Sequence, residues 1–169
     1  GTDDLDTPER LRTWLLTSVS NGGNDVDVPA ISPDDHREAL ALRDAVRVLA
    51  QCNTAEPPGD QAIRGATQVI RAFTLTVDVD EVGSVNLASV DPGVRALLAT
   101  IVAEVATASA VGRWQRLKVC RSADCRWAFY DASPARVATW CSMSVCGSRS
   151  KARAYRRRKG QDGDHAPTP

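Results

Sequence analysis

Two short stretches near the C-terminal end decide the fold of that region: Cys120-Arg-Ser-Ala-Asp-Cys125 and Cys141-Ser-Met-Ser-Val-Cys146. Each stretch holds two cysteines with four residues between them, and fifteen residues separate the two pairs. A closed tetrahedral zinc site suits this pattern, because each short loop presents two thiolates and the gap accommodates a hairpin. The spacing predicts one structural zinc ion bound by Cys120, Cys125, Cys141 and Cys146.

Two disulfides or four buried cysteines are the alternatives to zinc. Disulfides need an oxidising compartment, and the chain has no signal-peptide pattern and no apolar run of the roughly 20 residues that a membrane helix needs. We therefore expect a cytoplasmic protein without a membrane partner. Zinc would also stabilise a segment whose apolar side chains form too small a core. Those side chains are Trp127, Phe129, Tyr130, Trp140, Val145 and Tyr155.

The remaining cysteine and the two histidines are not expected to bind metal. Cys52 lies one turn beyond Leu49 on an apolar helix stripe and is expected in the core. His36 lies among acidic residues and His165 lies in a polar tail, so both are expected to be solvated. Four thiolates leave no obvious open coordination position, which favours a structural zinc over a catalytic one. An enzyme is further disfavoured because no paired nucleophile and base and no glycine-rich phosphate loop are present.

The charge of the chain is strongly segregated, although its sum is zero. Residues 113–160 carry thirteen Lys and Arg against two Asp, which gives +11 and leaves −11 on the remainder. A zinc tetrathiolate carries −2 and would reduce the basic part to about +9. Such asymmetry indicates two modules with different partners, of which the basic one suits polyanions.

The first 112 residues predict a mainly helical domain with one small β-hairpin. Ser32 followed by Pro33 and Asp35 is a capping-box start for the clearest helix. Four helices are predicted: Pro8–Val19, Pro33–Cys52, from Asp60 through Phe73, and from Asp91 to about Gly112. A break is predicted at 21–24, and alternating apolar residues predict hairpin strands from Leu75 to Val79 and at Val85 and Leu87.

Residues 113–160 predict a small zinc-stabilised ββα-like module, followed by a disordered tail at 161–169. We expect a knuckle at Cys120–Cys125, a strand or hairpin from Trp127 to Asp131, and a helix that starts near Ser142 and carries Cys146 in its first turn. The expected inward stripe of this helix is Val145, Ser148, Ala152 and Tyr155. The candidate nucleic-acid contacts are Arg149, Lys151, Arg153, Arg156, Arg157 and Arg158.

This basic helix has no acidic residue to pair with between Ser142 and Lys159, so its self-repulsion favours a polyanionic partner. DNA is the first expectation, with Arg149 and Arg153 as the residues expected to reach base edges. RNA, an acidic protein surface and a merely solvated face remain alternatives. The helical domain is a candidate sensor of an unknown small-molecule effector, with Trp14 and Trp114 either lining a pocket or packed in the core.

Two longer stretches resemble known families. Cys120-Arg-Ser-Ala-Asp-Cys-Arg-Trp-Ala-Phe-Tyr-Asp-Ala-Ser133, together with Trp140-Cys-Ser-Met-Ser-Val-Cys-Gly-Ser-Arg-Ser-Lys-Ala-Arg153, resembles the bacterial CGNR-type zinc fingers over about residues 117–158. Asp4-Leu-Asp-Thr-Pro-Glu-Arg-Leu-Arg-Thr-Trp-Leu15 is similar to the helical ABATE domain that usually precedes that finger. The resemblance implies a stress-induced or ligand-responsive transcription regulator, with the four cysteines as zinc ligands.

The chain departs from the family pattern at three places. Ser148 stands where the family has the Asn of Cys-Gly-Asn-Arg, so the hydrogen bonds of that Asn must be replaced or lost. The stretch from Pro134 to Thr139 lacks the usual richness in Arg and Gly, which weakens any contact made from that loop. The short apolar segment that commonly opens the N-terminal domain is not recognisable.

Overall fold

A computed structural model describes residues 5–19 and 27–162, which form two compact units. The first, here called the helical unit, contains the residues up to Leu49 and Pro58–Trp114. The second, here called the finger unit, contains Gln115 onward together with Ala50–Pro57. A short segment from the middle of the N-terminal region therefore belongs to the same unit as the four cysteines.

The helical unit has four helices and one hairpin in its described residues, close to the elements predicted from sequence. The observed elements are α1 (Pro8–Val19), α2 (Pro33–Gln51), α3 (Asp60–Arg71), β1 (Leu75–Val79), β2 (Val85–Ser89) and α4 (Gly93–Ala110). The last two residues of α2 already lie in the finger unit. The predicted break at 21–24 lies outside the described residues. The mainly helical fold with a small hairpin is thus confirmed.

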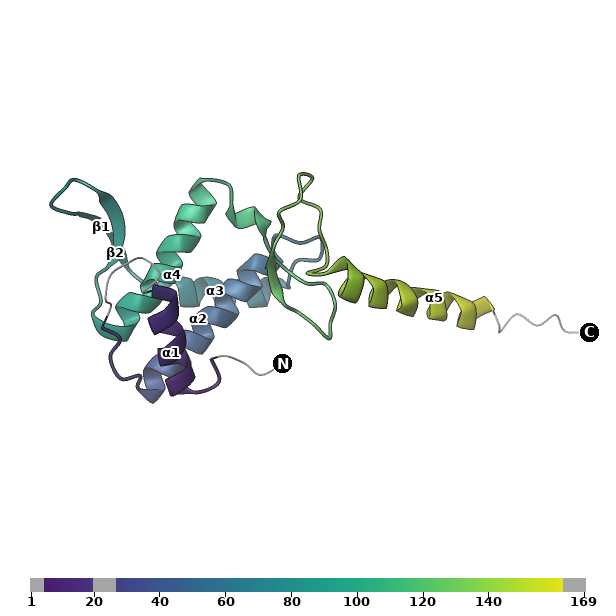
Figure 1. The fold of residues 1–169 in the computed structure, drawn as a ribbon, viewed down its shortest axis with the longest axis horizontal. Helices are drawn as coiled ribbons and strands as arrows, with labels where there is room; N and C mark the ends of the chain where they lie inside the picture. Colours follow the sequence, from purple (N-terminus) through teal and green to yellow (C-terminus); the bar gives the residue numbers. More distant parts are fainter. Residues whose placement is uncertain (1–4, 20–26, 163–169) are drawn as a thin grey trace, which may run out of the picture. The chain divides into compact units, whose positions relative to one another are not determined.

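Local sequence signals account for the ends of these elements. The Ser32 hydroxyl accepts a hydrogen bond from the Asp35 amide at 3.1 Å, and the Asp35 carboxylate accepts one from the Ser32 amide at 2.9 Å. This reciprocal pair is the capping box, and it fixes the start of α2. At the tip of the hairpin Asp80 accepts from the Ser84 amide at 2.8 Å, and Gly83 takes φ 82°, which glycine adopts without strain. Val77 pairs with Leu87 across the hairpin, which projects from the helices of this unit (Figure 1).

The core of the helical unit joins α1, α2 and α4 through apolar side chains. Its buried members are Leu11, Leu15, Val28, Ala39, Leu42, Phe73, Val94, Leu98, Ala99 and Val102. Arg95 holds the edge of this core: its guanidinium lies 4.7 Å from the centre of the Phe73 ring and forms ion pairs with Asp91 and Glu38. By length and composition α4 could cross a membrane. Val94, Leu98, Ala99 and Val102 of this helix are buried in the core.

Three expectations for individual residues of the N-terminal region are wrong or incomplete. Cys52 is exposed, because α2 ends at Gln51 and the chain turns before the apolar stripe continues. His36 is half-buried and its Nε2 lies 2.8 Å from the Leu5 carbonyl oxygen, so it is not simply solvated. Trp14 is 36% exposed and is not one of the buried core residues. His165 lies outside the described residues.

The finger unit has a ββα order, as the sequence predicts. The 3-10 turn Trp114–Arg116 leads into β3 (Leu117–Val119), which pairs antiparallel with β4 (Ala128–Tyr130), with Lys118 opposite Phe129. A π turn (Met143–Gly147) then opens α5 (Ser148–Asp162). Figure 1 shows α5 as a single helix that extends away from the strands and loops of this unit. The predicted tail begins at 161, and residues 163–169 of it lie outside the described residues.

Candidate metal centre

The four predicted ligands form one cluster. The sulfur atoms of Cys120, Cys125, Cys141 and Cys146 all lie within 4.8 Å of one another. Cys141 Sγ is 3.6 Å from Cys125 Sγ and 3.7 Å from Cys146 Sγ. Zn–S bonds of about 2.3 Å in a tetrahedron place the sulfurs about 3.8 Å apart, whereas a disulfide needs about 2.05 Å. The cluster therefore fits one zinc ion and excludes disulfides between these cysteines.

The first cysteine pair is held by the end of the two-stranded sheet. Cys120 follows β3 directly, and its amide donates to the Trp127 carbonyl at 2.8 Å. The Ser122 carbonyl accepts from the amides of Cys125 at 2.9 Å and Arg126 at 3.0 Å, which closes the knuckle. Arg126 takes φ 50°, in the left-handed region, so the chain turns sharply and β4 can begin.

The second pair is held by the π turn at the start of α5. Ser142 caps this turn, since its hydroxyl accepts from the Val145 amide at 3.3 Å. Its carbonyl accepts from the Cys146 amide at 2.9 Å and from the Gly147 amide at 3.1 Å. The hydroxyl of Ser148, the residue that replaces the family Asn, donates to the Met143 carbonyl at 3.2 Å. Ser148 thus supplies a hydrogen bond of its own to the turn that carries Cys146.

Gly147 is buried beside the second cysteine pair. A larger residue would not fit there unless a neighbouring side chain moved. A Cβ atom at this position would lie 2.2 Å from the sulfur of Met143 and 3.3 Å from a ring carbon of Trp140. Met143 is an exposed, flexible side chain that can move, whereas Trp140 is half-buried. Glycine therefore allows the Trp140 ring to pack close to the chain next to Cys146.

The surroundings shift the thiol pKa values of the cluster in different directions, and for Cys120 burial is outweighed by hydrogen bonds, which lower the pKa. Burial raises the pKa of the Cys141 thiol to about 12, and neighbouring thiols act in the same direction. Burial also raises the pKa of Cys146. Without a cation Cys141 and Cys146 therefore keep their protons at neutral pH, because burial disfavours the charged thiolate. A divalent metal ion reverses this balance by displacing the protons.

A buried ion pair lies beside the metal centre and organises the loop between the two cysteine pairs. The side chains of Lys118 and Asp131 are 7% and 1% exposed, and their charged atoms are 2.8 Å apart. The Lys118 ammonium also donates to the Arg136 carbonyl at 2.5 Å. The Lys118 ammonium and the Ser133 side chain hold the pKa of the Asp131 carboxyl well below its usual range. Asp131 is therefore a carboxylate at neutral pH.

The carboxylate of Asp131 also binds the returning chain. It accepts from the amide of Ser133 at 3.1 Å, from the hydroxyl of Ser133 at 2.6 Å, and from the amide of Ala138 at 2.9 Å. Arg116 donates to the carbonyls of Asp131 at 2.8 Å and Ser133 at 3.1 Å. These contacts set the path of the loop that ends at Cys141. Asp131 is one of only two acidic residues in the basic region 113–160, and this was a sequence signal for an ion pair. The sequence alone did not identify its partner, Lys118.

Most of the aromatic residues expected to form the finger core lie on its surface. Trp127, Tyr130 and Tyr155 are all more than half exposed. Only Phe129 and Trp140 of the expected set are half-buried. The buried residues of the unit are instead Ala50, Lys118, Val119, Cys120, Ser122, Asp131, Cys146 and Gly147. The centre of this unit is thus made of sulfur ligands and an ion-pair network, which strengthens the case for metal-dependent folding.

The inward stripe predicted for α5 is wrong. Val145, Ser148, Ala152 and Tyr155 are exposed, and Ser150 and Ala154 are half-buried instead. A π turn holds more residues than an α-helical turn, so it rotates the residues that follow about the helix axis. Because the π turn precedes α5, α-helical spacing counted from Ser142 selects the wrong face.

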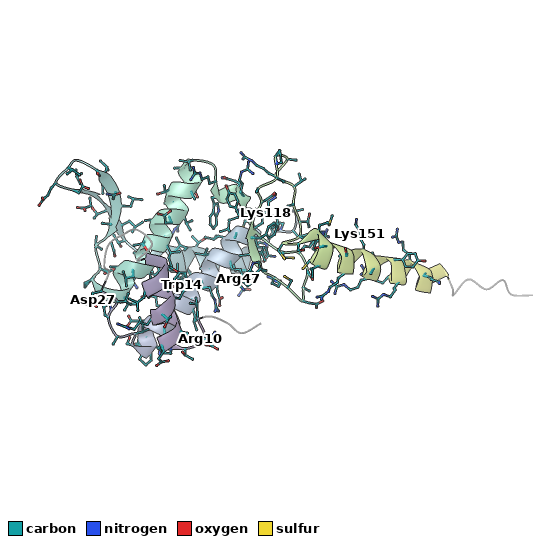
Figure 2. All side chains as sticks on the ribbon, viewed as in Figure 1. Arg10, Trp14, Asp27, Arg47, Lys118 and Lys151 are labelled. Carbon is teal, nitrogen blue, oxygen red and sulfur yellow. The ribbon has the colours of Figure 1, made fainter. Side chains whose placement is uncertain are left out.

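The predicted nucleic-acid contacts all lie on α5 and are exposed. Arg153 differs from the others, because its guanidinium pairs with Asp124 at 2.5 Å and donates to the Ser122 hydroxyl at 3.4 Å. It fastens α5 to the first knuckle. The other cations of the helix form no ion pair with any side chain that the structure describes: Arg149, Lys151, Arg156, Arg157, Arg158 and Lys159. Figure 2 shows Lys151 projecting from the first half of α5.

Two known families match the chain, one over each of its two sequence regions. The CGNR zinc finger matches residues 116–159, and the ABATE family, described as "Putative stress-induced transcription regulator", matches residues 1–114. No curated protein matches the chain. The four clustered cysteines lie inside the finger match, which supports the prediction of one structural zinc ion. Since the longer match covers more than half of the 169 residues, the chain belongs to the ABATE family and carries a CGNR zinc finger at residues 116–159.

Proposed function

We propose that this protein is a cytoplasmic transcription regulator, without catalytic activity, that binds DNA through the exposed cations of α5. The observation that carries the proposal is the unpaired charge of this helix. Seven Lys and Arg side chains lie exposed on α5, and all but Arg153 form no ion pair with the side chains that the structure describes. The helix contains no acidic residue before Asp162. Like charges at this spacing repel one another, and phosphate groups would neutralise them.

The zinc centre holds the N-terminal end of α5 in place. Cys146 lies in the turn that opens α5, and Arg153 ties the middle of the helix to the first knuckle. Zinc supplies no reaction here; four thiolates close its coordination shell, and the ion joins the two cysteine pairs. The helix is thereby presented as a rigid, basic element, which is how many small DNA-binding modules place a helix in the major groove.

The contacts of Arg153 refine the roles of the cations. Arg149 lies near the start of α5 without an ion pair among the described residues and is the proposed base-reading side chain. Arg153 keeps 45% of its side chain exposed but already holds Asp124, so we assign it mainly to orienting the helix. Arg156, Arg157, Arg158 and Lys151 are proposed phosphate contacts. The family description supports a stress signal as input, which we assign to the helical unit.

The proposal is tested by the salt dependence of DNA binding by the full, zinc-loaded chain. Four to six phosphate contacts predict a logarithmic slope of about −4 to −5, so affinity should fall about 10²- to 10³-fold between about 50 and 200 mM salt. Arg156→Gln should flatten the slope by about 0.9, while Arg64→Gln on α3 of the helical unit is the control. Preferred sites would come from selection on random duplexes. No binding to duplex DNA at about 50 mM salt would end the proposal, and tighter binding to single-stranded or duplex RNA would favour the RNA alternative.

A further inference from the structure

The segment Ala50–Pro57, which belongs to the ABATE region by sequence, is an integral part of the finger unit. Asn53 donates from its side-chain amide to the Leu117 carbonyl on β3 at 2.9 Å. The Thr54 hydroxyl donates to the Gln51 carbonyl at 2.7 Å, which closes the turn after α2. The segment is therefore bound to the strand that leads directly into Cys120.

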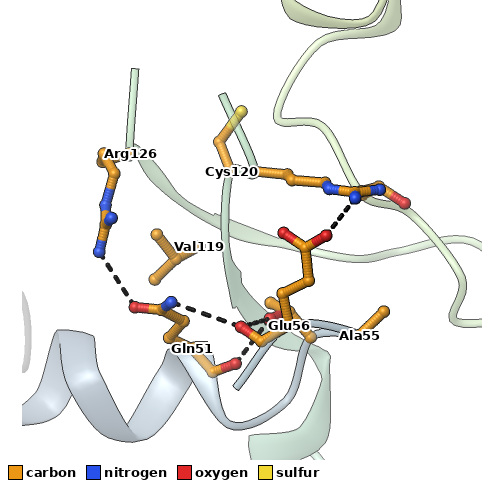
Figure 3. Close-up of a pocket in the computed structure, with 9 residues that line it drawn as sticks. Gln51, Ala55, Glu56, Val119, Cys120 and Arg126 are labelled. Carbon is orange, nitrogen blue, oxygen red and sulfur yellow. Dashed lines mark hydrogen bonds and ion pairs between the residues drawn. The ribbon is translucent and has the colours of Figure 1, made fainter. Parts of the chain in front are cut away.

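Two arginines border the first cysteine pair, and this segment binds both. Arg121 follows Cys120 and forms an ion pair with the Glu56 carboxylate. Arg126 follows Cys125 and donates to the Gln51 side-chain oxygen at 3.0 Å. The Gln51 amide in turn donates to the Glu56 carbonyl at 3.4 Å. Figure 3 shows Gln51, Glu56 and Arg126 around a pocket that Arg121 also lines.

The partners that Arg121 and Arg126 have within the chain can be replaced by another hydrogen-bond acceptor. The side chains of Arg121 and Glu56 are 50% and 58% exposed, so water screens their attraction. An ion pair this exposed changes an equilibrium constant by no more than about fivefold. A guanidinium binds a phosphate through the same fork of N–H donors that it offers to a carboxylate. A phosphate can therefore replace the Glu56 carboxylate on the Arg121 guanidinium.

The position of the knuckle brings these arginines next to the basic helix. Arg153 of α5 binds Asp124 and Ser122, and both of these residues lie between Arg121 and Arg126 in the chain. The loop bordered by the two arginines thus lies against α5. A nucleic-acid backbone on α5 has the knuckle as the neighbouring surface of the same unit.

We propose that Arg121 and Arg126 form a second phosphate-binding site beside the first cysteine pair, and that Glu56 and Gln51 cover this site when nucleic acid is absent. The inference rests on the proposed function of α5 and extends it, because it adds two contacts outside the helix and a competitor supplied by the chain itself. Binding then requires that the Glu56 carboxylate give up Arg121 to a phosphate of the nucleic-acid backbone.

The test compares Glu56→Gln with wild type, using the full zinc-loaded chain and a labelled random-sequence DNA duplex. Glutamine keeps the size of the side chain but loses the competing charge. Affinity at about 50 mM salt should rise about two- to fivefold, because Arg121 no longer has to leave the Glu56 carboxylate before it binds a phosphate. Asp34→Asn, which breaks an exposed ion pair with Arg37 in the helical unit, is the matched control for net charge.

A double-mutant comparison assigns the effect to Arg121. Arg121→Gln should weaken binding in the wild-type background and should abolish the gain produced by Glu56→Gln. Equal affinities of Glu56→Gln and Asp34→Asn would overturn the inference, as would a gain that persists without Arg121. In either case measurable wild-type binding would leave the proposed function of α5 standing. A wild-type chain that does not bind duplex DNA would overturn both.

Discussion

Replacing Lys118 by Met should destabilise the finger unit far more than its single charge suggests. The methionine side chain keeps the length of the lysine stem, so the change removes the ammonium group and little packing. The Asp131 carboxylate, 1% exposed, then loses its only cationic partner among the described ion pairs. Removing one partner of a buried ion pair costs about 3–5 kcal/mol, because the remaining charge stays buried without an opposite charge beside it.

The expected magnitude follows from the small size of the unit. One kcal/mol shifts the unfolding temperature of a domain of about 60–100 residues by about 4–8 °C, so Lys118→Met should lower it by more than about 10 °C. The assay is thermal unfolding of the zinc-saturated chain, followed by the near-ultraviolet circular dichroism of the tryptophans and by zinc release. Zinc release reports on the finger unit alone, because the four ligands lie within it.

Lys151→Met is the matched control, because it is the same substitution in the same unit. Lys151 lies exposed on α5 and forms no ion pair with the side chains that the structure describes, and Figure 2 shows both lysines. An exposed substitution of this kind should change stability by no more than about 0.5 kcal/mol. If the two variants released zinc at the same temperature within a few degrees, the ion pair would not stabilise the loop and our reading of the network would be refuted.

Two further predictions concern the metal. Chelation of zinc should unfold the finger unit while α1, α2 and α4 persist, because only the finger unit lacks an apolar core. The amide NMR signals of each unit report this, and an equal loss of signals from both units would contradict the prediction. Zinc affinity should fall as pH falls from about 8 to 6, since burial raises the pKa values of Cys141 and Cys146 and zinc must displace their protons. Each displaced proton contributes about tenfold per pH unit, measured by competition with a chromophoric chelator, and a flat profile would mean that the thiols are already ionised.

Local signals in the sequence were sufficient for the elements of the helical unit. A capping box at Ser32, a proline at the first helical position of α1 and alternating valines in the hairpin each act over a few residues, and the structure has an element at every one of these places. Helix ends were less certain. The apolar stripe of α2 predicted an end at Cys52, but the helix ends at Gln51 and Cys52 is exposed. The Thr54 hydroxyl bonds back to the Gln51 carbonyl, and Asn53 bonds to Leu117 instead of continuing the helix.

The metal ligands were also determined by the sequence, because cysteine spacing within each loop restricts the geometry that a tetrahedral ion can use. The sequence did not determine which face of α5 packs inward. Its inward face depends on a π turn, whose extra residue is stabilised by Gly147 and by the hydroxyls of Ser142 and Ser148. Nothing in the α-helical periodicity of the sequence indicates where such a turn occurs.

The sequence by itself determined the order of elements, the four zinc ligands and the separation of charge between the two regions. Only the tertiary structure decided what the cations do. Lys118 is buried on Asp131, Arg153 is fastened to Asp124, and Arg121 is covered by Glu56, although all three count equally in the +11 of the sequence. Their partners are 13, 29 and 65 residues away in the chain. Composition reports that charges are present, whereas pairing over such separations depends on how the folded backbone brings distant residues together.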